Sequence, residues 1–151
     1  MKSGVQQAIT VSITEPFQDA AYTDFPAIYV KASRNPDELT EEETARYGFF
    51  LSSYLKRLEH AHSQFVEGFL DEPTWKAIDA GARIQFQSIG MDRYWNVRKV
   101  TYSEKFRGYV AALIVEASPG EDTMTAVDAI RLFKTPRFRR VRQPWPQPVT
   151  Q

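Results

Sequence analysis

Apolar side chains recur at spacings of three and four residues between Thr40 and Asp71, which predicts one long amphipathic helix over residues 40–71. Positions with this spacing share one face of an α-helix, and here the apolar face is wide. The helix therefore needs cover from more than one neighbouring element, which makes it the centre of the expected architecture. The stripe consists of Phe50, Leu51, Tyr54, Leu55, Leu58, Ala61, His62, Phe65, Val66 and Phe69.

Helix starts can be located from residues that accept hydrogen bonds from the free amides of a first helical turn. Thr40 stands three residues before Glu43, which is the spacing of a capping box. Thr14, Asp24 and Asp71 each stand two residues before a proline, which is tolerated in a first turn because its missing N–H would have no partner there. Besides the start at Thr40, helices are expected to begin near residues 15, 25 and 72.

The stretch from Ile9 to Thr14 allows two interpretations. It alternates apolar and polar residues and is rich in β-branched side chains, which is typical of a strand. Val5, Ile9 and Ile13 also fit a helical spacing. Because the sequence offers no second convincing strand to pair with this one, a helix is favoured over a strand for residues 8–14.

Further helical segments are predicted after the long helix. A stripe from Trp75 to Ile89 forms the second arm of an antiparallel hairpin, and a short segment covers residues 91–98. Ser103 is the expected N-cap of a strong helix that ends near Ser118, where Pro119 and Gly120 follow. A weaker helix is expected over residues 123–133.

Composition limits the class of protein. A chain of 151 residues is long enough for one hydrophobic core. The absence of cysteine excludes disulfides, thiol catalysis and thiolate metal sites. The longest purely apolar run, from Tyr109 to Val115, is too short to cross a bilayer, and the first four residues open no signal peptide. We therefore expect a cytoplasmic protein.

The formal net charge of zero conceals an uneven distribution. Residues 134–151 contain five basic residues and no acidic ones, whereas the other 133 residues contain 14 basic and 19 acidic ones, so the two parts carry +5 and −5. Four prolines after Thr135 rule out a regular helix there and predict an extended, mobile tail. We expect an all-helical domain over residues 1–118 and a weak helix followed by a basic, proline-rich tail over residues 119–151.

Two clusters are candidates for chemistry. Glu59 and His62 have the Glu-x-x-His spacing of di-metal helical bundles, but the chain has only two histidines and lacks the second such motif. A packing role is therefore favoured for His62. Glu67, Asp71 and Glu72 form a cluster in which paired carboxylates could serve acid–base catalysis, although a helix cap and a helix start explain them more simply. We predict no catalytic residue, no metal ligand and no cofactor.

Cations interleaved with aromatic residues suggest a second function. The segment from Arg93 to Lys99 could bind an anion or stack a base, or its aromatic residues could pack inward while its cations face solvent. The basic tail is the better candidate for weak binding to nucleic acid or an acidic membrane surface. The candidate anion-binding residues are Arg93, Arg98, Lys99, Arg137, Arg139, Arg140 and Arg142.

Several segments of the chain resemble those of one protein family. The matching residues are Asp37-Glu38-Leu39-Thr40-Glu41-Glu42-Glu43, Glu59, Gln64, Glu67-Gly68-Phe69-Leu70-Asp71-Glu72, Trp75, Tyr94-Trp95-x-x-Arg98-Lys99 and Tyr102-Ser103-x-x-Phe106-Arg107. The stretch from Pro36 to Ala117 thus resembles a widespread group of uncharacterised bacterial proteins, usually a membrane-anchoring helix followed by a small all-helical domain. The resemblance implies an all-helical fold and a membrane association in any longer native form with an anchor upstream of Met1. It implies no catalytic residue.

These observations predict an all-α fold, a helical bundle built on a hairpin over roughly residues 40–88. The leading hypothesis for function is a non-enzymatic interaction module that self-associates as a homodimer or binds another protein. It rests on the surplus of apolar helix face over the strong helices available to cover it. The alternative is an anion-binding domain that uses the basic tail.

Overall fold

The computed structural model describes residues 2–116, so the predicted helix over residues 123–133 and the basic tail lie outside the described residues. The described part contains six α-helices, two short 3-10 helices and no strand, which confirms the all-α class and the helical interpretation of residues 8–14. The elements are α1 (Lys2–Ala21), α2 (Phe25–Arg34), η1 (Pro36–Glu38), α3 (Glu41–Val66), α4 (Glu72–Gln85), α5 (Ile89–Arg98), η2 (Lys99–Thr101) and α6 (Glu104–Glu116).

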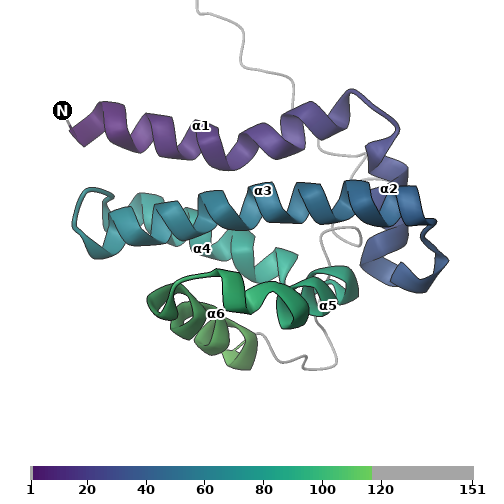
Figure 1. Cartoon of the computed structure of the whole chain (residues 1–151). Helices are drawn as coiled ribbons and strands as arrows, with labels where there is room; N and C mark the ends of the chain where they lie inside the picture. The colour runs from purple at the N-terminus through teal and green to yellow at the C-terminus, as the bar shows by residue number, and fades with distance from the viewer. Residues whose placement is uncertain (1, 117–151) are drawn as a thin grey trace, which may run out of the picture.

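The long helix α3 lies at the centre of the arrangement, as its wide apolar face predicts (Figure 1). Helices α1 and α4 both run antiparallel to α3, with α1 beside it and α4 behind it in the view of Figure 1. Helix α2 packs near the start of α3, and α5 and α6 cover the side away from α1. Within residues 2–116, no helix combines the length and the apolarity that crossing a bilayer requires.

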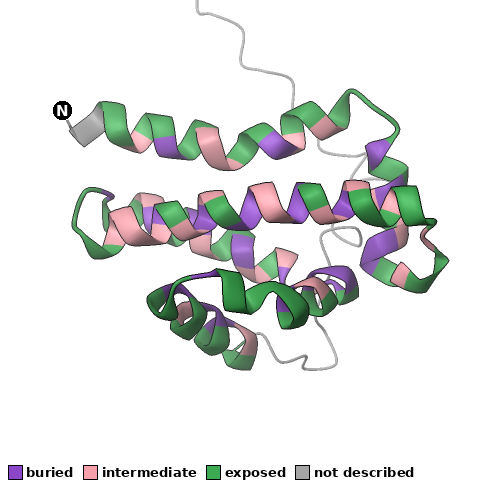
Figure 2. Cartoon of the chain, in the orientation of Figure 1, coloured by how far each residue is buried: buried purple, intermediate pink, exposed green. Residues whose placement is uncertain are grey.

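Two aromatic clusters fill the core along α3. The first surrounds the early turns of the helix and contains Phe17, Phe25, Tyr29, Tyr47, Phe50 and Tyr54. The second surrounds its last turns and contains His62, Phe65, Trp75, Tyr109 and Phe106. Figure 2 shows the consequence: buried residues follow the inner face of α3, whereas most of α1 is exposed.

The predicted extent of the central helix is wrong at its C-terminal end. Helix α3 ends at Val66 because Gly68 adopts a positive φ of 80°, a conformation that breaks the helix and favours glycine. The carbonyl of Gln64 then accepts from the amides of Phe69 and Leu70, at 2.9 and 3.1 Å. Val66 and Phe69, which the stripe places on the apolar face, are both exposed.

Most of the predicted caps are present. The Asp71 carboxylate accepts from the Thr74 amide at 2.8 Å, and the Ser103 hydroxyl accepts from the Phe106 amide at 3.3 Å. Asp24 precedes α2 as predicted but makes no side-chain cap, because its carboxylate binds Arg46 of α3 instead. Ser88 caps α5 through the Met91 amide.

The predicted helix start near residue 15 is wrong, because Pro16 lies inside α1. A proline has no N–H to donate, so the carbonyl of Ser12, four residues earlier, loses its partner within the helix. Arg57 of α3 supplies the missing donor through Nη1, at 2.9 Å from the Ser12 carbonyl oxygen. The same guanidinium also binds the Glu15 carboxylate. Pro16 therefore marks the point where α1 docks on α3.

Candidate interaction surface

Phe49 is the least buried aromatic residue of the central helix, with 75% of its surface exposed. It follows from helix geometry that two consecutive phenylalanines cannot share a face, since successive residues are turned by about 100°. Phe50 belongs to the buried stripe and contacts the rings of Phe17 and Phe25. Its neighbour Phe49 is consequently directed away from the core of its own chain.

A shallow, wide-open groove of about 360 Å³ lies beside Phe49, between α1, α2 and α3. Phe49 itself forms part of its lining, and Tyr22, 91% exposed, directly precedes another lining residue, Thr23. We call this region the Phe49 surface. The residues that line it are Pro16, Ala20, Thr23, Phe25, Arg46, Phe49, Phe50 and Ser53.

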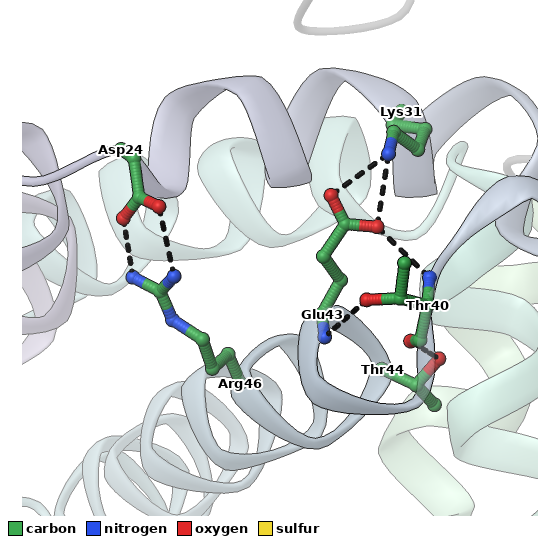
Figure 3. Close-up of polar contacts among 6 residues, drawn as sticks. All are labelled: Asp24, Lys31, Thr40, Glu43, Thr44 and Arg46. Atoms are coloured by element: carbon green, nitrogen blue, oxygen red, sulfur yellow. Dashed lines mark hydrogen bonds and ion pairs between the residues drawn. The ribbon is translucent and has the colours of Figure 1, made fainter.

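Two ion pairs link α2 and its N-cap residue to α3, and one of them involves Arg46 of the Phe49 surface (Figure 3). Arg46 donates to both carboxylate oxygens of Asp24, at 3.0 and 2.6 Å. Lys31 donates to both carboxylate oxygens of Glu43, at 2.8 and 2.9 Å. These hydrogen bonds lower the pKa of Asp24 and of Glu43 below their ordinary values. The groove is thus bounded by two helices that are linked to each other at two points.

The three predicted anion-binding residues of the described region differ in their partners. Arg93 donates to both carboxylate oxygens of Asp37, at 2.6 and 3.1 Å, and so links α5 to η1. Arg98 and Lys99 are exposed and make no ion pair with a described carboxylate. Trp95 is buried, as the simpler interpretation of this segment expects. The tail residues Arg137, Arg139, Arg140 and Arg142 lie outside the described residues, so anion binding stays a prediction.

His62 packs among aromatic rings of α4 and α6. Its ring stacks on Tyr109 with centroids 4.8 Å apart and lies 5.5 Å from the ring of Trp75. Burial lowers the pKa of His62 and the charge of Lys105 adds to this effect, whereas the charge of Glu59 opposes it. Among the described residues, no group of histidine and acidic side chains could hold a metal ion.

Glu59 has a structural role that the sequence motif does not suggest. One of its carboxylate oxygens accepts from the backbone amide of Ser103 at 2.7 Å, and the other pairs with Lys56 at 2.9 Å. Lys56 in turn donates to the Thr101 carbonyl and lies 4.1 Å from the centroid of the Tyr102 ring. Glu59 and Lys56 together tie the loop before α6 to the central helix.

The carboxylates at the turn between α3 and α4 each have a separate partner. Glu67 accepts from the Ser63 hydroxyl at 2.8 Å, Asp71 caps α4, and Glu72 pairs with Lys76 at 2.8 Å. All three contacts are local to the helix ends. The arrangement matches the capping explanation of this cluster.

The spacing of apolar residues along the chain does not predict the Phe49 surface, although the sequence contains one signal for it. In a helical segment, the adjacent pair Phe49-Phe50 leaves one ring outside the apolar stripe.

Comparisons of the chain with protein-family models, curated proteins and solved structures found no match. The resemblance to the bacterial all-helical group stays a prediction.

Proposed function

We propose that the protein is a non-enzymatic, helical-bundle interaction module that self-associates through the Phe49 surface. The observation that carries this proposal is the exposure of the Phe49 ring beside an apolar groove on the same face. An aromatic ring left in water has a large apolar area to bury, and aromatic residues dominate the binding energy of protein interfaces.

A second copy of the chain fits this surface because the surface contains both a projecting ring and a groove. In an interface with two-fold symmetry, each residue pair occurs twice, so that the Phe49 ring of each copy can enter the groove of the other. The groove offers apolar contacts from Pro16, Ala20 and Phe25. Ser53 and Ala45, which flank Phe49 on α3, are small and leave room for a close approach of two helices.

The test is sedimentation velocity of the wild type and of Phe49→Ser over a wide range of protein concentration. We expect the mass of the wild type to rise with concentration and the dissociation constant of the variant to be at least about tenfold weaker. Because the side chain is exposed, the variant should keep the wild-type circular dichroism spectrum and thermal midpoint.

Val97→Ser is the matched control, since Val97 is 74% exposed and lies on α5, away from the Phe49 surface. This variant should associate like the wild type. A wild type that stays monomeric at all concentrations, or a Phe49→Ser variant that associates normally, would contradict the proposal.

A further inference from the structure

A second cavity, of about 260 Å³, lies between α1, α3 and α4. It shares no lining residue with the Phe49 surface. Ile13 and Phe17 of α1 and Ala77 and Ile78 of α4 supply most of its apolar lining. The cavity is partly open to solvent, and its volume exceeds the roughly 150 Å³ of an enclosed, engineered apolar cavity that binds benzene, so a molecule somewhat larger than benzene would fit.

The lining of this cavity carries no charged residue, which selects for an uncharged occupant. Most of its polar groups already have partners. The hydroxyls of Thr10 and Thr14 donate to backbone carbonyls of α1, at 3.0 and 2.9 Å. The side-chain oxygen of Gln85 accepts from the Tyr29 hydroxyl at 2.5 Å.

Tyr54 is the exception among these polar groups. It lines the cavity from α3, only 3% of its surface is exposed, and its hydroxyl makes no hydrogen bond with any described residue. The fully enclosed side-chain oxygens without a partner in the described part are those of Ser33 and Gln87, and the Tyr54 hydroxyl is not among them. Burial also raises the pKa of Tyr54, which keeps the hydroxyl protonated and able to donate.

A hydroxyl with no partner among the described residues is free to donate to an acceptor on a bound molecule. We propose that the cavity binds a small, uncharged, apolar molecule that carries one hydrogen-bond acceptor, such as a carbonyl oxygen, and that the Tyr54 hydroxyl donates to that acceptor. The apolar side chains of α1 and α4 enclose the rest of the molecule. Neither Tyr54 nor this cavity takes part in the self-association proposed above.

Two probes of nearly the same shape distinguish the hydrogen bond from simple apolar uptake. Acetophenone carries a carbonyl acceptor, whereas isopropylbenzene carries none. Titration of the wild type with each, followed by two-dimensional NMR, should shift the amide signals of residues around the cavity for both probes. In Tyr54→Phe, the affinity for acetophenone should fall about fivefold, while that for isopropylbenzene stays unchanged.

Gly81 is an exposed residue of the lining, so a side chain can be added there at the edge of the cavity. It lines the cavity, and a Cβ added there would meet nothing within 4 Å. Gly81→Leu should therefore weaken the binding of both probes. Gly108→Leu is the matched control, because Gly108 of α6 has the same open surroundings but does not line the cavity.

Both leucine variants replace a glycine within a helix by a better helix former, so each should stay folded. Three results would each overturn the proposal. The first is a wild type that binds neither probe, and the second is undiminished binding by Gly81→Leu. The third is a Tyr54→Phe variant whose preference between acetophenone and isopropylbenzene equals that of the wild type.

Discussion

Gly90 of α5 lies directly against α2 and α3. A Cβ added there would lie 2.7 Å from the backbone oxygen of Ala32 in α2 and 2.8 Å from the ring and hydroxyl of Tyr47 in α3. Ala32 and Tyr47 are buried, and burial raises the pKa of Tyr47 to about 12. Because the first obstacle is backbone and the second is a packed ring, neither can move aside without disturbing the core.

We predict that Gly90→Ala lowers the free energy of unfolding by about 1–3 kcal/mol, although alanine is the better helix former. Urea unfolding would measure the change. Gly108→Ala, where a Cβ meets nothing within 4 Å, should instead raise the free energy of unfolding by about 0.5–1 kcal/mol. Equal effects of the two substitutions would show that the α2–α5 contact is looser than described.

At the scale of elements, the docking of α1 depends on a donor from another helix. The Ser12 carbonyl lacks a helical partner because of Pro16, and Arg57 replaces that partner from α3. The guanidinium also donates to the Ser12 hydroxyl at 3.1 Å and binds Glu15. A helix with a local defect is thereby completed by its neighbour, so the two positions should be energetically coupled.

A double-mutant cycle measures this coupling. Arg57→Ala should lower the free energy of unfolding by about 1–3 kcal/mol, because it leaves the Ser12 carbonyl without a donor. Pro16→Ala restores an amide at the position that can reach Ser12, so the cost of Arg57→Ala in that background should be about 1 kcal/mol smaller. Strict additivity of the two substitutions would contradict the assigned role of Arg57.

Helix starts could be predicted from the sequence where a side chain accepts a hydrogen bond from the amides of the first turn of its own helix. Thr40, Asp71 and Ser103 act locally, so their caps follow from spacing alone. The failures at Pro16 and Asp24 share one cause, which is that a distant arginine changes the outcome. Gly68 is a local signal for the end of α3, but the apolar spacing continues past it to Phe69 and therefore predicts a helix that is too long.

At the scale of the whole molecule, the second aromatic cluster joins α3, α4 and α6. His62 stacks on Tyr109, whose hydroxyl donates to Asp79 of α4 at 2.8 Å. Asp79 pairs with Arg83, and Arg83 also pairs with Glu116 at the end of α6, both at 2.7 Å. A change in the charge of His62 therefore acts on a junction of three helices.

We predict that the protein becomes less stable as the pH falls from 7.5 to 5.5. The pKa of His62 in the folded state lies below its ordinary value of 6.5, so in this range the unfolded state binds more protons than the folded state. The stability that this difference in pKa gives the folded state is fully present above pH 6.5, the ordinary pKa of histidine. It is lost as the pH falls through the folded-state pKa of His62.

Urea midpoints at several pH values would measure the loss, and His62→Gln should reduce it. His60→Gln is the control, since His60 is exposed, and it should keep the wild-type dependence. Stability that rises on acidification over this range would contradict the prediction.

The candidate sites were harder to predict than the fold, because both depend on the relative placement of three helices. The Phe49 surface needs α1 and α2 beside α3, and the apolar cavity needs α1 and α4 beside it. Spacing along the chain identifies Phe50 and Tyr54 as core residues, but it does not show which core residues border an unfilled space. Identifying those residues requires knowledge of how the helices pack against one another.

The carboxylate of Glu43 has a consequence for cooperativity. It accepts from the Thr40 amide at 2.9 Å, which starts α3, and it binds Lys31, which holds α2 (Figure 3). Fraying of the first turn of α3 and release of α2 therefore disturb the same group. Two openings that would otherwise be independent become one coupled event, so this end of the molecule should open as a single unit in hydrogen exchange.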